Sequence, residues 1–270
     1  MTVLLLLVVF VGLFALGVPI AVCIGASTLA TMLVTMAFDP AVTTIAQRMA
    51  GGLNSFALLA IPLFILSGQL MAHGGIARRL IDFSKALIGM VPGGLAFVNV
   101  ISCTLFGAIS GSAVAATSAI GGFMIPEMNK EGYDRDFNAA ITATSATTGL
   151  LIPPSNILIV YAVASGGVSI AALFVAGYVP GILVGLGLMT VCAVYAKRHN
   201  LPRGERVPFG LAVKKTLAAV PSLFLIILVI GGILGGIFTA TEAGAIAVVY
   251  AFVLSSLVYR EIPLSGMREI

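Results

Sequence analysis

The chain has 270 residues, of which 60% are hydrophobic and only 9% are charged. Soluble domains carry about a quarter charged residues, so a water-soluble fold is excluded and an all-α polytopic membrane protein is predicted. The formal net charge of +4 comes from basic residues scattered among short loops rather than gathered in a stripe, so nothing indicates a nucleic-acid partner.

The N-terminal part, residues 1–90, is predicted to supply scaffold-type helices. Residues 3–36 contain no charged side chain and are too long for the apolar region of a signal peptide. One helix of that length would reach roughly 50 Å against a hydrocarbon core of ~30 Å, so a tilt or a break near Gly17-Val18-Pro19 is expected. A second apolar run covers residues 56–71, and the charges in residues 76–90 recur at the spacing of an amphipathic helix on the cytoplasmic surface.

Residues 91–196 are predicted to form the first repeat of a transport domain. Residues 92–128 are apolar but are interrupted by small and polar residues at positions 107–113. Each arm would be only about 22 Å long as a helix, which favours a re-entrant helical hairpin with its tip at membrane depth.

A broken helix is predicted next, over residues 137–166. Pro153 and Pro154 remove two backbone donors and disfavour helix at the residue before them, so the helix is expected to be discontinuous there. Such a break is tolerated at membrane depth only where it is buried in protein or lines a cavity. A further helix is predicted over residues 168–196, a basic cytoplasmic connector over 197–215, and the start of a second half over 216–270.

The basic residues predict the orientation of the chain. If residues 3–36 cross once and the hairpin returns to its own side, all Lys and Arg except Arg48 fall on one face. The positive-inside rule assigns that face, and the N-terminus with it, to the cytoplasm. The thirteen residues are Arg78, Arg79, Lys85, Lys130, Arg135, Lys197, Arg198, Arg203, Arg206, Lys214, Lys215, Arg260 and Arg268.

The two interruptions have the composition of an ion or substrate site. Glycines allow the backbone to bend, and hydroxyls, an amide and freed carbonyls are neutral oxygens that suit a sodium ion. The alternative reading is close helix packing, which small residues also permit. The candidate sodium and substrate residues are Gly107, Ser110, Gly111, Ser112, Thr147, Thr148, Gly149, Pro153, Pro154, Ser155 and Asn156.

An ordered set of motifs resembles one family. The segments are GAISGSA at 107–113, AIG at 119–121, IPEM at 125–128, GY at 132–133, GLLIPPSN at 149–156, LFVAG at 173–177 with PG at 180–181, and GGIFTATEA at 235–243. Together they resemble the large membrane subunit of tripartite ATP-independent periplasmic (TRAP) transporters over nearly the whole chain.

That resemblance implies a sodium-driven importer of small organic acids of the C4-dicarboxylate or sugar-acid type, located in the bacterial inner membrane. The partners it implies are a small membrane subunit and a periplasmic binding protein, and the mechanism is an elevator-like movement of a transport domain. It implies no cofactor besides sodium as the coupling ion. The family's second hairpin and second Pro-Pro break do not occur before Ile270, so an N-terminal part is expected.

Other interpretations of the sequence remain open. Glu242 is an intramembrane acid, yet Thr239-x-x-Glu242 also fits a capping box. An intramembrane serine protease would need a base beside Ser110 or Ser112, and both histidines are expected far away, so no enzyme is predicted. A channel, a carrier of another sodium-coupled family and a non-transporting membrane fragment remain as alternatives.

Overall fold

The computed structural model describes residues 2–204 and 207–263. The chain divides into two compact units, Met1–Ser55 and Phe56–Ile270. Every regular element in the described residues is a helix, and the one β-bridge there joins Pro92 to Arg203. The predicted all-α class is therefore confirmed. Arg206 and Arg268, which entered the orientation count, lie outside the described residues.

The first unit consists of α1 (Thr2–Ala15), α2 (Ile20–Met32) and α3 (Phe38–Leu53). The expected break in the first apolar run is present, because α1 ends at Ala15 and Gly17 adopts a φ of +78° before Pro19 precedes α2. The helices α1 and α2 pack together and are each about 20 Å long, short of a ~30 Å hydrocarbon core. The predicted orientation of the chain was derived by counting residues 3–36 as one membrane crossing. Because these two short helices do not establish such a crossing, the orientation stays a prediction.

The second unit begins with a 3₁₀ turn (Phe56–Leu59) that leads into α4 (Ala60–His73), followed by α5 (Ile76–Ile88). The amphipathic helix expected over residues 76–90 is present as α5. Its buried face, with Ile76, Leu80 and Ile81, packs between α6 and α12. The amphipathic pattern of α5 therefore reflects packing inside the protein.

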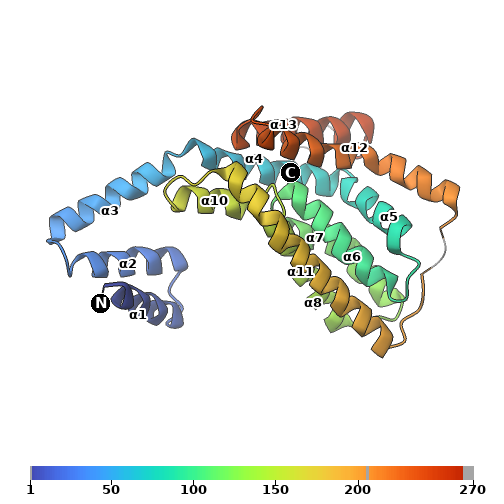
Figure 1. Ribbon diagram of the computed structural model, residues 1–270, viewed down its shortest axis with the longest axis horizontal. Coiled ribbons are helices and arrows are strands. Elements are labelled where there is room, and N and C mark those ends of the chain that lie inside the picture. Colours follow the sequence, from blue (N-terminus) through green and yellow to red (C-terminus); the bar gives the residue numbers. More distant parts are fainter. Residues whose placement is uncertain (1, 205–206, 264–270) are drawn as a thin grey trace. The chain divides into compact units, whose positions relative to one another are not determined.

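The helical hairpin is formed by α6 (Gly94–Ser110) and α7 (Ala113–Lys130). Gly111 turns the chain with a φ of +61°, in the region that glycine enters without strain, and Ser112 is the N-cap of α7. The helix α6 is buried along most of its length and contacts α4, α5, α7, α8, α9 and α11, so it is the central helix of this unit (Figure 1).

The broken helix consists of α8 (Arg135–Ala146), α9 (Thr148–Leu151) and α10 (Asn156–Ala164). The axis bends by 50° between the α8–α9 segment and α10, at the two prolines that predicted the break. The long helix α11 (Ile170–Arg198) lies against α6 and α9 and closes this side of the bundle (Figure 1).

The remaining helices are α12 (Phe209–Leu234) and α13 (Ala240–Phe252), which ends in a π-helical turn (Val253–Val258). Four helical segments in the described residues are long and apolar enough to cross a membrane: Phe56–His73, Ile170–Arg198, Phe209–Leu234 and Ala240–Val258. The bent α8–α10 pair is a fifth if it counts as one span. These spans make the chain a multi-pass membrane protein.

Candidate functional site

The hairpin and the broken helix meet at a contact between two glycines. A Cβ built on Gly107 of α6 would lie 2.5 Å from the Cα of Gly149 in α9, and one built on Gly149 would lie 2.4 Å from the Cα of Gly107. Both glycines are buried. Only hydrogen at both positions permits this approach, so the two predicted interruptions lie backbone to backbone.

A second contact joins the hairpin tip to the break itself. A Cβ on Gly111 would meet the carbonyl oxygen of Pro154 at 2.8 Å and the backbone nitrogen of Asn156 at 3.2 Å. The backbone N–H of Asn156 donates to the carbonyl of Gly111 over 3.4 Å. The turn of the hairpin is therefore held against the start of α10.

Ser155 organises the break between α9 and α10. Its hydroxyl donates to the carbonyl of Leu150 and accepts a hydrogen bond of 3.4 Å from the backbone N–H of Leu158, which caps α10. Pro153, Pro154 and Ser155 are all buried, and the peptide bond between the prolines is cis. The backbone interruption thus lies inside the protein, as a break at membrane depth requires.

The predicted hairpin serines have local hydrogen bonds. Ser110 is fully buried, and its hydroxyl lies 3.4 Å from both the backbone nitrogen and the carbonyl oxygen of Ser112. The hydroxyl of Ser112 accepts a bond of 3.3 Å from the N–H of Ala115 and caps α7. These serines shape the turn, and their oxygens lie at the tip.

The two predicted threonines differ in position. Thr148 is fully buried and bonds to the hydroxyl of Thr104 across α6 at 2.9 Å. Thr147 is exposed, and its hydroxyl bonds to the carbonyl of Thr144 in its own turn. The structure therefore groups Thr148 with the other predicted residues and leaves Thr147 outside the group.

Asn156 supplies the oxygen that is best placed for a ligand. Its Oδ1 atom is buried and has no hydrogen-bond partner among the described residues. A buried carbonyl-type oxygen without a donor is costly unless a water or a cation satisfies it. The described residues contain no cluster of His, Cys, Asp or Glu fit for a metal, and the polar side-chain atoms at this contact are neutral oxygens and one amide. Such a donor set suits a hard monovalent cation.

Sequence reasoning missed the residues that pack around this group. A Cβ on Gly68 of α4 would lie 2.7 Å from Cβ of Ser110, and one on Gly177 of α11 would lie 2.3 Å from the carbonyl oxygen of Leu151. Gly177 and Gly181 have the four-residue spacing typical of close helix contacts. This spacing is the sequence feature from which the close packing of α11 could have been predicted. Gly68 stands alone in α4, and no local pattern distinguishes it.

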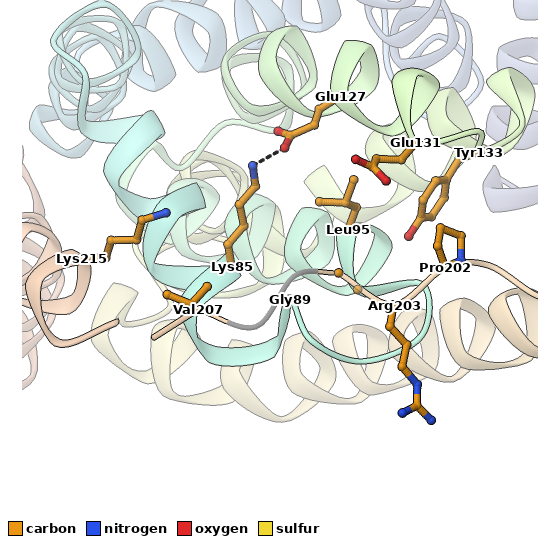
Figure 2. A pocket seen from close by; sticks show the side chains of 12 residues that line it. Lys85, Gly89, Leu95, Glu127, Glu131, Tyr133, Pro202, Arg203, Val207 and Lys215 are labelled. Carbon is orange, nitrogen blue, oxygen red and sulfur yellow. Dashed lines mark hydrogen bonds and ion pairs between the residues drawn. The ribbon is translucent and has the colours of Figure 1, made fainter. Parts of the chain in front are cut away.

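A pocket of about 340 Å³ lies elsewhere, at the opposite end of α6 from the hairpin tip, and roughly 20 Å along the helix separates the two. Figure 2 shows Lys85 of α5 reaching Glu127 of α7 across this pocket, whereas Arg203 points away from it. Burial raises the pKa of Tyr133, whose phenol lies in the pocket wall, to about 12. The pocket is separate from the candidate site.

Comparison with known proteins decides the family. The family model described as "Tripartite ATP-independent periplasmic transporter, DctM component" matches residues 7–270. The chain belongs to this TRAP transporter family. The resemblance found in the sequence motifs is therefore confirmed, and because the family comprises transport permeases, the chain is not an enzyme.

Several relatives align over almost all of the chain. The YgiK protein of Salmonella typhimurium is 52% identical over 97% of the chain and 60% of its own length. The C4-dicarboxylate TRAP transporter large permease protein DctM of Vibrio cholerae is 40% identical over 97% of the chain and 57% of its own length. The 2,3-diketo-L-gulonate TRAP transporter large permease protein YiaN of Escherichia coli is 38% identical over 100% of the chain and 63% of its own length. The chain thus spans about 60% of the length of these relatives.

Proposed function

We propose that this TRAP permease chain forms part of a sodium-coupled secondary transporter that imports small organic acids across the bacterial inner membrane. The partners are a small membrane subunit and a periplasmic binding protein that delivers the substrate. The names of the relatives, which include C4-dicarboxylate and diketogulonate permeases, support an organic acid as substrate. The distribution of basic residues supports a cytoplasmic N-terminus, given a single crossing by residues 3–36.

One observation carries the proposal: the hairpin tip and the helix break meet through Gly107 with Gly149 and through Gly111 with Asn156. Two helix C-terminal ends, those of α6 and of the α8–α9 segment, converge there with the N-terminal ends of α7 and α10. Helix C-termini carry partial negative charge and favour a cation, whereas N-termini favour an anion. A cation and a carboxylate can therefore bind side by side without any charged side chain.

Transport follows an elevator-like movement in this proposal. The helices α6 to α11 form the moving unit, which carries the re-entrant hairpin tip and the broken helix, and the residues before position 91 form its scaffold. The tight glycine contact supports a single moving unit, because it fixes the hairpin and the broken helix to each other as one body.

The test is uptake of labelled C4-dicarboxylate by proteoliposomes that contain the complete permease, the small subunit and the binding protein. Uptake is expected to require an inward sodium gradient and the binding protein. The variant Asn156→Ala is expected to raise the sodium concentration for half-maximal uptake at least several-fold, because it removes the unpartnered Oδ1. The matched control is Thr147→Val, which alters a hydroxyl outside the group and should leave sodium dependence unchanged.

Two outcomes count against the proposal. Uptake that does not depend on the sodium gradient would show that sodium is not the coupling ion. A sodium conductance that needs neither substrate nor binding protein would instead identify the chain as part of a channel.

A further inference from the structure

Buried polar side chains gather between α6 and α8, in a region we call the α6–α8 seam. All of its members have no exposed surface. The seam consists of Asn99, Ser102 and Cys103 of α6 and Asn138, Thr142 and Ser145 of α8. It is separate from the candidate cation site and holds none of the residues that the sequence motifs singled out.

One side-chain hydrogen bond joins the two helices of the seam, and a second connects the seam to Asn129 of α7. The amide Nδ2 of Asn99 donates to the hydroxyl of Thr142 over 2.8 Å, and the Nδ2 of Asn138 donates to Oδ1 of Asn129 over 2.8 Å. The Sγ atom of Cys103 lies 3.7 Å from Oδ1 of Asn99. These contacts run along the helix pair from the α7–α8 end toward the hairpin tip.

Three oxygens of the seam nevertheless have no partner. Five buried side-chain oxygens lack a hydrogen bond among the described residues, and three of them, Ser102 Oγ, Asn138 Oδ1 and Ser145 Oγ, belong to the seam. Buried polar atoms are almost always bonded to protein or to ordered water, so a concentration of exceptions in one place is informative. Ser102 lies one turn from Asn99, and Ser145 one turn from Thr142, on the same helix faces.

The hydroxyls of Ser102 and Ser145 could have formed hydrogen bonds within their own helices. A helical Ser or Thr hydroxyl readily donates to a carbonyl three or four residues back, as Thr142 does to Asn138 and Thr104 does to Val100. Ser102 and Ser145 do not. A serine hydroxyl needs a donor and an acceptor together, which a water molecule provides and a metal cation does not. The ligand that matches the seam is therefore water.

We propose that the α6–α8 seam is a built site for internal water molecules, which bridge Ser102 and Ser145 and donate to Oδ1 of Asn138. A buried water typically makes two to four hydrogen bonds, roughly the number that these oxygens and the neighbouring amides offer. The seam approaches the Thr104–Thr148 bond, about one helical turn from the Gly107–Gly149 crossing. This site stands whether or not the crossing binds sodium.

Radiolytic hydroxyl labelling of the complete permease in lipid nanodiscs tests the site, because radicals form at bound water and oxidise the nearest sulfur. Cys103 lies in the seam, whereas Cys192 lies in α11 outside it, and both are core residues with no exposed surface. Cys103 is expected to be oxidised several-fold faster than Cys192. The variant Ser145→Ala should reduce that ratio, because a bridging partner is removed.

Thermal stability gives an independent second readout. In a dry seam, Ser102→Ala and Ser145→Ala would delete unsatisfied hydroxyls and raise the melting temperature. In a hydrated seam the same two variants break water bridges, so the melting temperature stays unchanged or falls. The matched control is Ser67→Ala, which removes a fully buried hydroxyl that donates to the carbonyl of Phe64. Equal oxidation of Cys103 and Cys192, or stabilisation by both seam variants beyond the control, would overturn the proposal.

Discussion

Gly107 and Gly149 cross so closely that a Cβ on either would lie within 2.5 Å of the other's Cα. The neighbouring atoms are backbone, which cannot rotate away as the end of a long side chain can. Replacing either glycine must therefore separate α6 from α9. Because Gly111 holds Asn156 a turn farther along, this separation also disturbs the hairpin tip.

The variant Gly107→Ala is accordingly expected to lose most sodium-dependent uptake and about 1–3 kcal/mol of stability, the usual cost of overpacking. Uptake in proteoliposomes and thermal unfolding in detergent measure the two effects. The control is Gly122→Ala in α7, where an added Cβ meets nothing within 4 Å and helix propensity alone should stabilise by about 1 kcal/mol. Wild-type uptake by Gly107→Ala would show that the crossing is not part of the transport site.

The double variant Pro153→Ala/Pro154→Ala tests the break. Alanine restores two backbone donors and allows α9 to continue toward α10, which would withdraw the carbonyl of Pro154 from Gly111. The apparent sodium affinity is expected to fall by about tenfold, equal to 1.4 kcal/mol of lost binding energy. Sodium-dependent uptake at graded concentrations measures it. An unchanged sodium affinity would show that the two prolines only bend the chain and do not contribute to sodium binding.

Much of this architecture was predictable because its signals are local. Proline and glycine interrupt helices through their own backbone chemistry, so the break before Asn156, the turn at Gly111 and the division at Gly17 could be read from sequence. The meeting of Gly107 with Gly149 depends on how α6 crosses α9, which no local pattern encodes. From the residues alone, the two interruptions were two separate clusters.

The individual roles were less predictable for the same reason. Thr147 and Thr148 are adjacent and chemically identical, and only the helix rotation decides that Thr148 faces Thr104 while Thr147 is exposed. The α6–α8 seam was missed because Asn99 stands among apolar residues, whereas Ser145 stands in a stretch of threonines and alanines far along the chain. Their alignment appears only when the helices are packed.

The choice for Glu242 between capping and transport can also be tested. The structure contains the full capping box: the hydroxyl of Thr239 accepts from the N–H of Glu242 at 3.3 Å, and the carboxylate accepts from the N–H of Thr239 at 2.8 Å. Thr239→Ala should therefore cost about 1 kcal/mol of stability, whereas Thr239→Ser should retain most of it. Thermal unfolding gives the values, and uptake per folded protein should stay constant. A loss of uptake without a loss of stability would indicate that Glu242 takes part in transport and does not only cap the helix.

The ion pair between Lys85 and Glu127 connects α5 with the hairpin helix α7, away from the hairpin tip. The side chains are 24% and 39% exposed, so solvent screens the pair and its contribution to stability is about 0–1 kcal/mol. In the proposed mechanism α5 belongs to the scaffold and α7 to the moving unit, so the pair would favour the arrangement seen here over others. Glu127→Gln should therefore change the rate of uptake more than it changes stability.

The reversed pair, Lys85→Glu with Glu127→Lys, provides the control, because it restores attraction while exchanging the charges. Its uptake rate is expected to return toward that of the wild type, and the effect of Glu127→Gln should shrink as ionic strength rises, since screening weakens exposed charge pairs. Uptake at several potassium chloride concentrations measures both effects under a constant sodium gradient. If the reversed pair behaves like the sum of its two single variants, the contact between Lys85 and Glu127 plays no part in the movement of α7 against α5.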